Sequence, residues 1–326
     1  MPSFKLAIAT VTLGRVALGH TLPTKLEAAG QAGYDGVELT YECFSAYNTS
    51  LGRTDSLDDR LETAADVAKL ASSFSLEIIS LQPFMNFDAL QDCSERLEVG
   101  KEWVQICAKL NARWLQIPSA VYPIPLDQAT TDYEVIAANL RLLADYAFPY
   151  EVELAYEAPS WGVAAKSWQD IDKIINLVDR PNIRHNLDTF HIATYEMYDP
   201  MTVQPRPDGD ERLKKSLEAL EKLDPNKIAY VQLSDGAPVD LSQSSYPVTD
   251  PSLPPFCIWS RNARVHPYDG HLPVARIAQA FFDTGFEGWV SQESFHWDGD
   301  EGAPDRWAER GVESWQRLKK ECGLAE

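Results

Sequence analysis

Residues 152–188 read VELAYEAPSWGVAAKSWQDIDKIINLVDRPNIRHNLD and contain a strand, a helix and a second strand in succession. The runs at 152–157 and 183–188 are short and rich in apolar residues, which is typical of buried strands. Between them, residues 168–179 carry apolar side chains at the i, i+3, i+4 spacing of a helix that packs on a sheet. This stretch therefore predicts one strand and helix unit of an α/β fold.

The same alternation continues over the whole chain of 326 residues. Eight such units fit a (β/α)8 barrel better than a doubly wound sheet, which usually has fewer strands and a phosphate-binding glycine motif that this sequence lacks. We predict a single TIM-barrel domain over residues 1–326. The predicted strands are residues 5–9, 35–39, 76–82, 113–117, 152–157, 183–188, 228–233 and 288–293, and the predicted helices are residues 24–33, 60–74, 96–110, 134–148, 168–179, 211–223, 274–285 and 306–320.

The longest connection without a regular pattern, residues 234–271, follows the seventh strand and is rich in Pro and Ser. A loop of this length in a compact domain is usually functional. In a TIM barrel, the loops that follow the strands open onto the face that carries the active site. We therefore expect this β7-α7 loop to contribute to the site.

The composition argues against several classes of partner. Asp and Glu outnumber Lys and Arg by 49 to 29, which gives a formal net charge of -20. Nucleic acids and anionic membranes attract clustered basic side chains, so we expect neither as a partner. The five cysteines are scattered without CxxC spacing, and no apolar run approaches the roughly 18 residues of a membrane span. We expect a cytoplasmic protein in which a local arginine attracts any anionic small-molecule substrate.

Four oxygen-bearing side chains fall at or next to the ends of the last four predicted strands. They are Glu157, Asp188, Gln232 and Glu293. Two glutamates, an aspartate and an amide that converge at the mouth of a barrel would form a cage for a hard divalent cation. A single acid at a strand end is more often a helix N-cap or a surface charge, but four on consecutive strands favour a metal site.

The stretch around Asp188 also contains two histidines with different expected positions. If Asp188 points toward the barrel axis, strand alternation places Asn186 on the same side and turns His185 toward the helices. We expect His185 to be a packing residue. His191, in the loop that we expect beyond the strand, can reach a substrate bound on the metal.

Several segments together resemble one enzyme family. The chain is similar to the xylose-isomerase-like barrels of the sugar-phosphate isomerase/epimerase superfamily and, within it, to the fungal 3-dehydroshikimate dehydratases. LDTF alone would indicate no more than an isomerase-like barrel, whereas the set is specific. The matching segments are LGRVALGH, GYDGVEL, LQPFMNFD, LQIPS, AYEAPSW, VDRPN with LDTF, YVQLSD, WSRNARV, GFEGWVS and ERGVESW.

The resemblance implies that Glu157, Asp188, Gln232 and Glu293 bind a divalent metal, most often magnesium or manganese. Many isomerases of the superfamily have histidine at the place of Gln232, and an amide oxygen shifts the preference toward harder ions than zinc. The metal would polarise the ketone of 3-dehydroshikimate. Removal of the C4 proton and loss of the C5 hydroxyl would then give protocatechuate.

The resemblance also implies roles for side chains around the substrate, a cyclic hydroxy-keto carboxylate. His191 is the expected base, because its ordinary pKa suits proton transfer near neutral pH. Some fungal members of the family carry Asn at this place. Arg261, in the long loop, would pair with the substrate carboxylate. If Arg261 does not bind it, Arg15 or Arg264 is the next candidate. Arg15 and His20 would assist at the rim.

Three other functions remain open at this point. In a ketose 3-epimerase or sugar isomerase, Glu157 and Glu293 would act as catalytic groups on opposite faces of an enediolate. An apurinic endonuclease of the same superfamily would need more histidine ligands and a basic groove, which the charge of -20 opposes. A non-catalytic scaffold would have a barrel mouth unable to bind metal.

Overall fold

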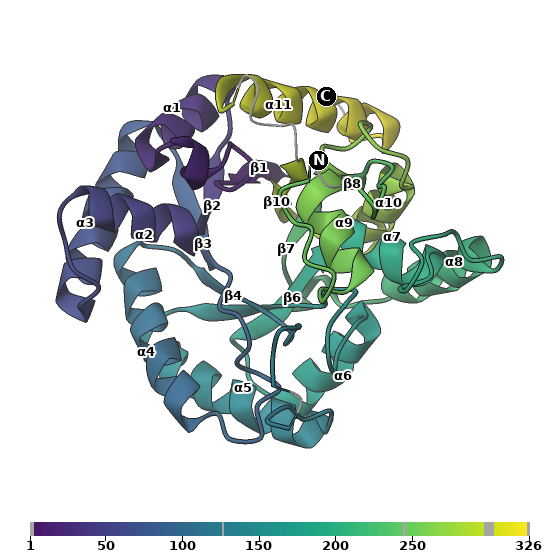
Figure 1. Cartoon of the computed structure of the whole chain (residues 1–326), viewed down its shortest axis with the longest axis horizontal. Coiled ribbons are helices and arrows are strands. Elements are labelled where there is room, and N and C mark those ends of the chain that lie inside the picture. The colour runs from purple at the N-terminus through teal and green to yellow at the C-terminus, as the bar shows by residue number, and fades with distance from the viewer. Residues whose placement is uncertain (1–2, 126, 244–245, 297–302, 325–326) are drawn as a thin grey trace.

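The computed structural model of the chain describes residues 3–125, 127–243, 246–296 and 303–324. Eight parallel strands form a closed barrel in the order β1-β10-β7-β6-β5-β4-β3-β2, and Figure 1 shows helices in a ring around it. The predicted TIM barrel is confirmed. Its strands are β1 (Phe4–Ala9), β2 (Gly36–Thr40), β3 (Glu77–Gln82), β4 (Trp114–Pro118), β5 (Glu153–Glu157), β6 (Ile183–Asp188), β7 (Ile228–Leu233) and β10 (Gly288–Gln292).

The helices bury one face each against the outside of the barrel, where a large apolar cluster fills the space between the two layers. In α3, for example, the N-cap Ser56 accepts a hydrogen bond from the backbone N–H of Asp59, and Ala64, Val67 and Ala71 pack inward. The helices are α1 (Leu22–Ala32), α2 (Tyr41–Ser50), α3 (Leu57–Ser73), α4 (Ser94–Lys109), α5 (Tyr133–Ala147), α6 (Trp168–Val178), α7 (Thr189–Met197), α8 (Gly209–Leu220), α9 (Pro255–Ala263), α10 (Val274–Asp283) and α11 (Asp305–Glu321), with short 3-10 turns at Val16–Leu18, Phe148–Tyr150 and Pro225–Lys227.

A second, smaller apolar cluster closes the inside of the barrel. Its members include Trp114, Ala155 and Tyr230. Each of these residues lies two positions before a polar residue on the same strand, so the polar side chains Gln116, Glu157 and Gln232 share the inner face and lie nearer the carboxyl ends of the strands. The apolar cluster is therefore a packed floor beneath a polar layer.

Helix α7 differs from the expected loop after β6. It begins directly after Asp188, so His191 lies in the first turn of a helix and not in a loop. Residues 189–194 of this helix are all buried, including the polar Thr189, His191 and Thr194, and a helix without an exposed face shows no apolar periodicity in its sequence. The loop prediction for His191 was wrong for this reason.

The connection at residues 234–271 is also more regular than its sequence indicates. It contains α9 and the short strands β8 (Asp235–Gly236) and β9 (Arg264–Val265), which form a small sheet with β11 (Phe295–His296) in the order β11-β9-β8. Asp235 joins the two ends of the connection. Its Oδ1 accepts a hydrogen bond from the backbone N–H of Leu272 at 2.8 Å, and the N–H of His271 donates to the carbonyl of Gly236 at 3.1 Å.

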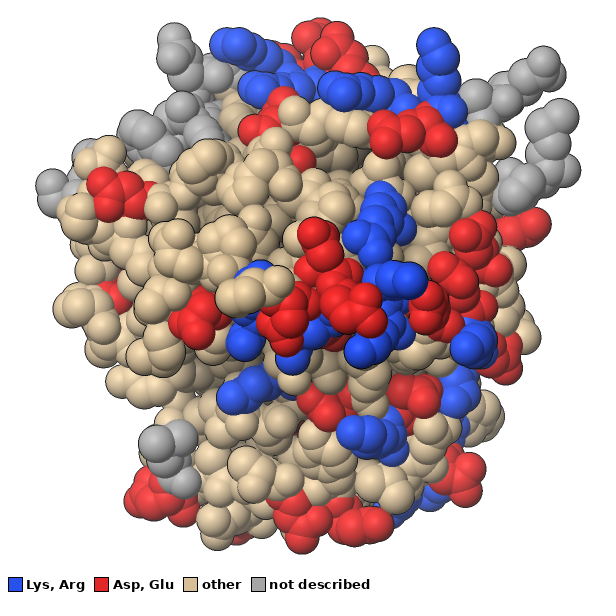
Figure 2. All heavy atoms as spheres, turned by 90° about the vertical axis from the view of Figure 1, so that its right-hand side faces the viewer, with Lys and Arg blue, Asp and Glu red and all other residues tan. Residues whose placement is uncertain are grey.

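Basic and acidic side chains are interspersed over the charged part of one face of the molecule, which Figure 2 shows. On α8, for example, Lys215 pairs with Glu211 at 3.2 Å. Within the part of the chain that the structure describes, no helix has both the length and the apolar character needed to cross a bilayer.

Candidate metal and substrate site

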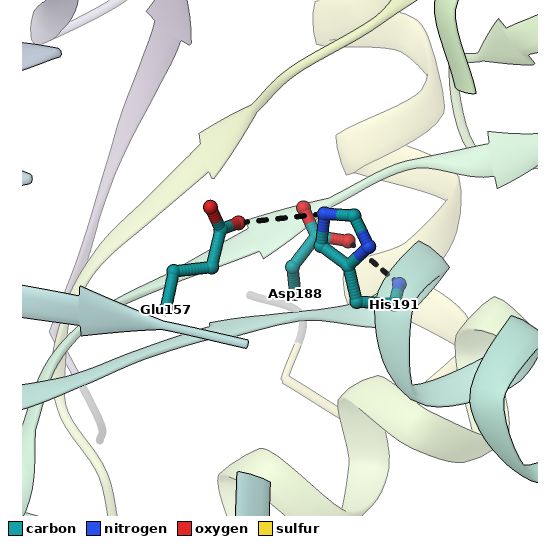
Figure 3. A group of neighbouring side chains, drawn as sticks. All are labelled: Glu157, Asp188 and His191. Atoms are coloured by element: carbon teal, nitrogen blue, oxygen red, sulfur yellow. Dashed lines mark hydrogen bonds and ion pairs between the residues drawn. The ribbon is translucent and has the colours of Figure 1, made fainter. Parts of the chain in front are cut away.

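Glu157, the last residue of β5, is buried at the mouth of the barrel with one oxygen atom unpartnered. Its Oε2 accepts a hydrogen bond from Nε2 of Gln116 at 2.7 Å. Its Oε1 has no hydrogen-bond partner among the described residues and lies 3.7 Å from Nε2 of His191. Figure 3 shows the carboxylate directed toward the imidazole. A buried carboxylate oxygen without a donor is favourable where a cation can bind it.

Asp188 ends β6, and its two carboxylate oxygens make different contacts. Its Oδ1 caps α7 by accepting hydrogen bonds from the backbone N–H groups of Phe190 at 2.7 Å and His191 at 3.2 Å. Its Oδ2 accepts a hydrogen bond from Nη2 of Arg264. Asp188 is therefore a helix N-cap, one of the alternatives to a metal ligand, and it also lies beside Glu157 at the candidate metal site.

Gln232 lies on β7 directly opposite Asp188 in the strand ladder, and its amide group is held from both sides. Nε2 donates to the two carboxylate oxygens of Glu38 at 3.0 and 3.1 Å. Oε1 accepts a hydrogen bond from Nδ2 of Asn186 at 2.9 Å. Glu38 therefore holds the amide nitrogen and leaves the amide oxygen directed toward Asn186 of β6.

Glu293 lies one residue beyond β10, and its Oε2 is 3.1 Å from Nη2 of Arg264. The structure thus brings three of the four predicted ligands, Glu157, Asp188 and Glu293, to the mouth of the barrel. Gln232 lies next to them through its pairing with Asp188. One oxygen each from Glu157 and Asp188 and one nitrogen from His191 lie within 4.8 Å of one another.

Burial and mutual repulsion disfavour the charged forms of these acids. The pKa of Glu157 is raised well above its usual value by burial and then by the charges of Glu293 and Asp188, while Arg264 opposes the shift. Burial also raises the pKa of Asp188 to about 6, against the effect of Arg264, and that of Glu38 to about 7, with a further contribution from Glu293. Full ionisation of these acids would therefore need more positive charge than Arg264 supplies, which fits the binding of a hard divalent cation.

His191 faces the same space, and its hydrogen bonds indicate which ring nitrogen carries the proton. Its Nδ1 accepts a hydrogen bond from the backbone N–H of Ser160 at 3.3 Å. Burial, followed by the charges of Arg264 and Arg261, lowers the pKa of His191 well below its usual value, so the ring is neutral near pH 7. A neutral imidazole that accepts at Nδ1 carries its proton at Nε2, the atom directed at Glu157. His191 therefore presents a hydrogen-bond donor to the site.

A cavity of ≈ 560 Å³ opens above these residues and is large enough for a small cyclic ligand. Arg261, at the end of α9, lies with its guanidinium 4.9 Å from the ring of Phe295, and that of Arg264 is 5.6 Å from the same ring. The cavity thus combines an apolar wall with positive charge. Its apolar lining includes Met85, Tyr122, Trp161, Val248, Leu253 and Phe295.

Arg15 and His20 lie in the connection between β1 and α1, and both are half-buried. Neither belongs to the described residues that line the cavity. The structure therefore does not bring these two predicted substrate-binding residues into the cavity wall, in contrast to Arg261. Their role at the rim stays a prediction.

Sequence analysis missed two residues of the site. Arg264 appeared there as a substitute for Arg261, yet its side chain contacts two predicted metal ligands. Glu38 lies inside the barrel on β2 and holds Gln232. An acid within an otherwise apolar strand is the signal that could have identified Glu38. The position of Arg264 depends on how residues 234–271 fold back, which no local pattern reveals.

Comparisons with known proteins match the whole barrel. Residues 26–318 match the model of the family described as xylose isomerase-like TIM barrel. A 3-dehydroshikimate dehydratase of Neurospora crassa is 34% identical, and the alignment covers 99% of this chain and 96% of that protein. A 3-dehydroshikimate dehydratase of Pseudomonas aeruginosa is 26% identical over 90% of this chain and 39% of its own length. The chain thus spans about two-fifths of that bacterial relative.

Solved structures share the fold at lower identity. A fusion protein of a xylose isomerase-like TIM barrel and a 4-hydroxyphenylpyruvate dioxygenase aligns with a TM-score of 0.76 and 24% identity, covering 99% of this chain and 43% of that chain. The IOLI protein, solved with a bound zinc atom, aligns with a TM-score of 0.69 and 19% identity, covering 97% and 98% of the two chains. In this chain, Glu157, Asp188 and His191 form a cluster that could hold a metal ion.

Proposed function

Because the chain belongs to the xylose isomerase-like TIM barrel family, we propose that it is a metal-dependent lyase that dehydrates 3-dehydroshikimate to protocatechuate. The observation that carries this proposal is the cage of buried carboxylates beneath a cavity with an arginine in its wall. A carboxylate cage suits the metal, and the arginine suits a substrate that is itself a carboxylate. The similarity to the Neurospora crassa dehydratase extends over nearly the full length of both proteins.

Glu157, Asp188, Gln232 and Glu293 are the proposed ligands, and magnesium or manganese is the proposed ion. The unpartnered Oε1 of Glu157 and the oriented amide oxygen of Gln232 support an all-oxygen set. Such a set matches hard ions better than zinc. When bound, the ion supplies a Lewis acid for the ketone oxygen of the substrate.

The chemistry requires the loss of one water molecule from the ring. The C4–H bond breaks and its electron pair is delocalised toward the C3 ketone, after which the C5–O bond breaks. The proton taken from C4 leaves with the C5 hydroxyl as water, and transfer of a C6 proton to the C3 oxygen completes the aromatic ring. We propose Glu157 as the base: its carboxylate faces the cavity, and while Oε1 would hold the ion, Oε2, oriented by Nε2 of Gln116, would accept the proton.

His191 is proposed as a neutral hydrogen-bond donor and no longer as the base. Its Nε2–H faces the space above Glu157, where it would stabilise negative charge that develops on a substrate oxygen. A neutral imidazole can polarise an oxygen in this way without giving up its proton. Asn, which the resemblance places here in some fungal members, also has an N–H donor but cannot serve as a base.

Arg261 is proposed to bind the substrate carboxylate, with Arg15 and His20 contributing at the rim. Arg261 lies in the cavity wall, and no acid among the described residues lies within ion-pair distance of it. We also propose a cytoplasmic location, which the five free cysteines support, because four of them are buried as thiols.

The test is an incubation of purified protein with 3-dehydroshikimate. The protein is stripped with EDTA, reloaded with Mn²⁺ or Mg²⁺, and the products are followed by chromatography and by the absorbance of protocatechuate. A parallel incubation with D-fructose tests 3-epimerisation. Formation of protocatechuate by the reloaded protein is the expected result. Epimerised sugar without any protocatechuate would contradict the proposal.

A further inference from the structure

Arg264 occupies an unusual position for an arginine, because 2% of its surface is exposed. Its Nε donates to Oγ of Ser234 at 2.8 Å, and its Nη2 donates to Oδ2 of Asp188 and lies 3.1 Å from Oε2 of Glu293. The centre of the guanidinium lies 5.4 Å from the ring of Phe190. One end of the group is thus fixed on the loop that follows β7, and the other end joins two carboxylates of the barrel mouth.

The charges around Arg264 do not balance. Four buried carboxylates, Glu38, Glu157, Asp188 and Glu293, lie together, and Arg264 is the positive side chain that contacts two of them. Isolated buried carboxylates are strongly disfavoured, so a cation at this place stabilises the fold before any metal arrives. The same contact occupies oxygen atoms that the metal would need.

We propose that Arg264 is a built-in counter-ion of the metal site and gives up Asp188 and Glu293 when a divalent cation binds. The inference rests on the proposed metal site. Asp188 and Glu293 would exchange the guanidinium of Arg264 for the metal ion. The reason is that the positive charges of the metal and of Nη2 repel each other when both are close to the same carboxylate oxygens. The hydrogen bond from Nε to Ser234 can persist during the exchange, so only the Nη2 end of the guanidinium would move away from the two acids.

This exchange has a measurable consequence for metal affinity. Each binding event in the natural protein must break the contacts of Arg264 with both acids. Removal of the guanidinium removes this competition, so Arg264→Gln should bind Mn²⁺ at least tenfold more tightly than the natural protein. Without metal, the same variant leaves the carboxylates uncompensated and should unfold at a lower temperature.

The experiment is a calorimetric titration of EDTA-stripped protein with Mn²⁺, without substrate, combined with thermal unfolding with and without Mn²⁺. Arg261→Gln is the matched control, because it removes the same charge from the same cavity but no contact with Asp188 or Glu293. We expect the affinity of this control to change by less than threefold. Arg264→Lys keeps the positive charge but loses the planar guanidinium, so it should tighten Mn²⁺ binding by a smaller factor than Arg264→Gln. This variant replaces Arg264→Gln in the titration if the glutamine variant does not fold.

Equal or weaker Mn²⁺ binding by the Arg264 variants would overturn the inference, because the arginine would then organise the ligands instead of competing for them. If the natural protein and the variants all fail to bind Mn²⁺, the inference falls together with the proposed metal site. If the natural protein binds Mn²⁺ and shows no dehydration, the proposed substrate is wrong while the titration still decides the role of Arg264.

Discussion

Replacement of Arg261 tests whether the cavity recognises a carboxylate. The side chain is exposed at the end of α9, and its guanidinium lies over the ring of Phe295 without a neighbouring acid among the described residues. Among the described residues, no ion pair of Arg261 must therefore break before it binds an anion. Arg261→Ala should leave thermal unfolding nearly unchanged, because exposed side chains of this kind contribute little to stability.

The expected cost lies in kcat/KM for 3-dehydroshikimate. A hydrogen bond to a charged group contributes about 1.5–3 kcal/mol, and partial exposure favours the lower half of that range. That lower half, about 1.5–2.2 kcal/mol, corresponds to a decrease of roughly 10- to 40-fold in kcat/KM, measured by the initial rate of protocatechuate formation. Arg261→Lys should recover part of the loss, since an ammonium retains the charge without the planar fork. An unchanged kcat/KM in Arg261→Ala would refute the reasoning and make an uncharged sugar a more credible substrate.

Three other perturbations have defined outcomes. Chelation should abolish turnover while circular dichroism stays that of a folded barrel, because the ligands lie above a packed apolar floor, and full activity in metal-free protein would contradict this. His191→Ala should lower kcat by about 10²–10³-fold, whereas His191→Asn should retain part of the rate through its N–H donor. The control variant His185→Leu should keep its catalytic activity. Equal losses of kcat in the Ala and Asn variants would indicate that His191 acts as a base and not as a hydrogen-bond donor. The pKa of Asp172 is lowered to about 2, chiefly by the hydrogen bond from His185, so the charged carboxylate stabilises the fold above the unfolded pKa of 3.8 and this effect is lost as the pH falls through 2. Asp172→Asn should therefore lower the free energy of unfolding at pH 7 by about 1 kcal/mol after solvent screening. In acid denaturation curves, the difference between the variant and the natural protein should vanish near pH 2.

The barrel could be predicted from sequence because its strands are buried on both faces and read as continuous apolar runs. The predicted strand at 183–188 coincides with β6, and the others agree with the structure within one or two residues. Alternation also placed His185 among the helices, where its Nε2 lies 3.3 Å from Asp172 of α6. Helix α7 escaped prediction since its polar and apolar residues are buried alike, so the segment has no apolar periodicity.

The convergence of Glu157, Asp188 and Glu293 followed from their positions at strand ends, which meet at one face in any parallel barrel. The state of each group did not follow. The tautomer of His191 depends on a backbone N–H of Ser160 in a different loop, and the orientation of Gln232 depends on Glu38 across the barrel. These contacts join residues that are distant in sequence, so no local pattern contains them.

The hydrogen bonds at Asp235 make the connection at residues 234–271 a segment that begins and ends at the same point. Its first and last residues are tied by Leu272 and His271, so the barrel strands do not depend on the path taken in between. The barrel strands carry Glu157, Asp188 and Gln232, whereas this segment carries Arg261 and Arg264. We therefore expect that the segment can be exchanged for one of different length and charge, cut at Gly236 and Gly270, provided that Arg264 keeps its place on Asp188 and Glu293. The result would be a barrel with the same floor and carboxylates but a different preference among ligands.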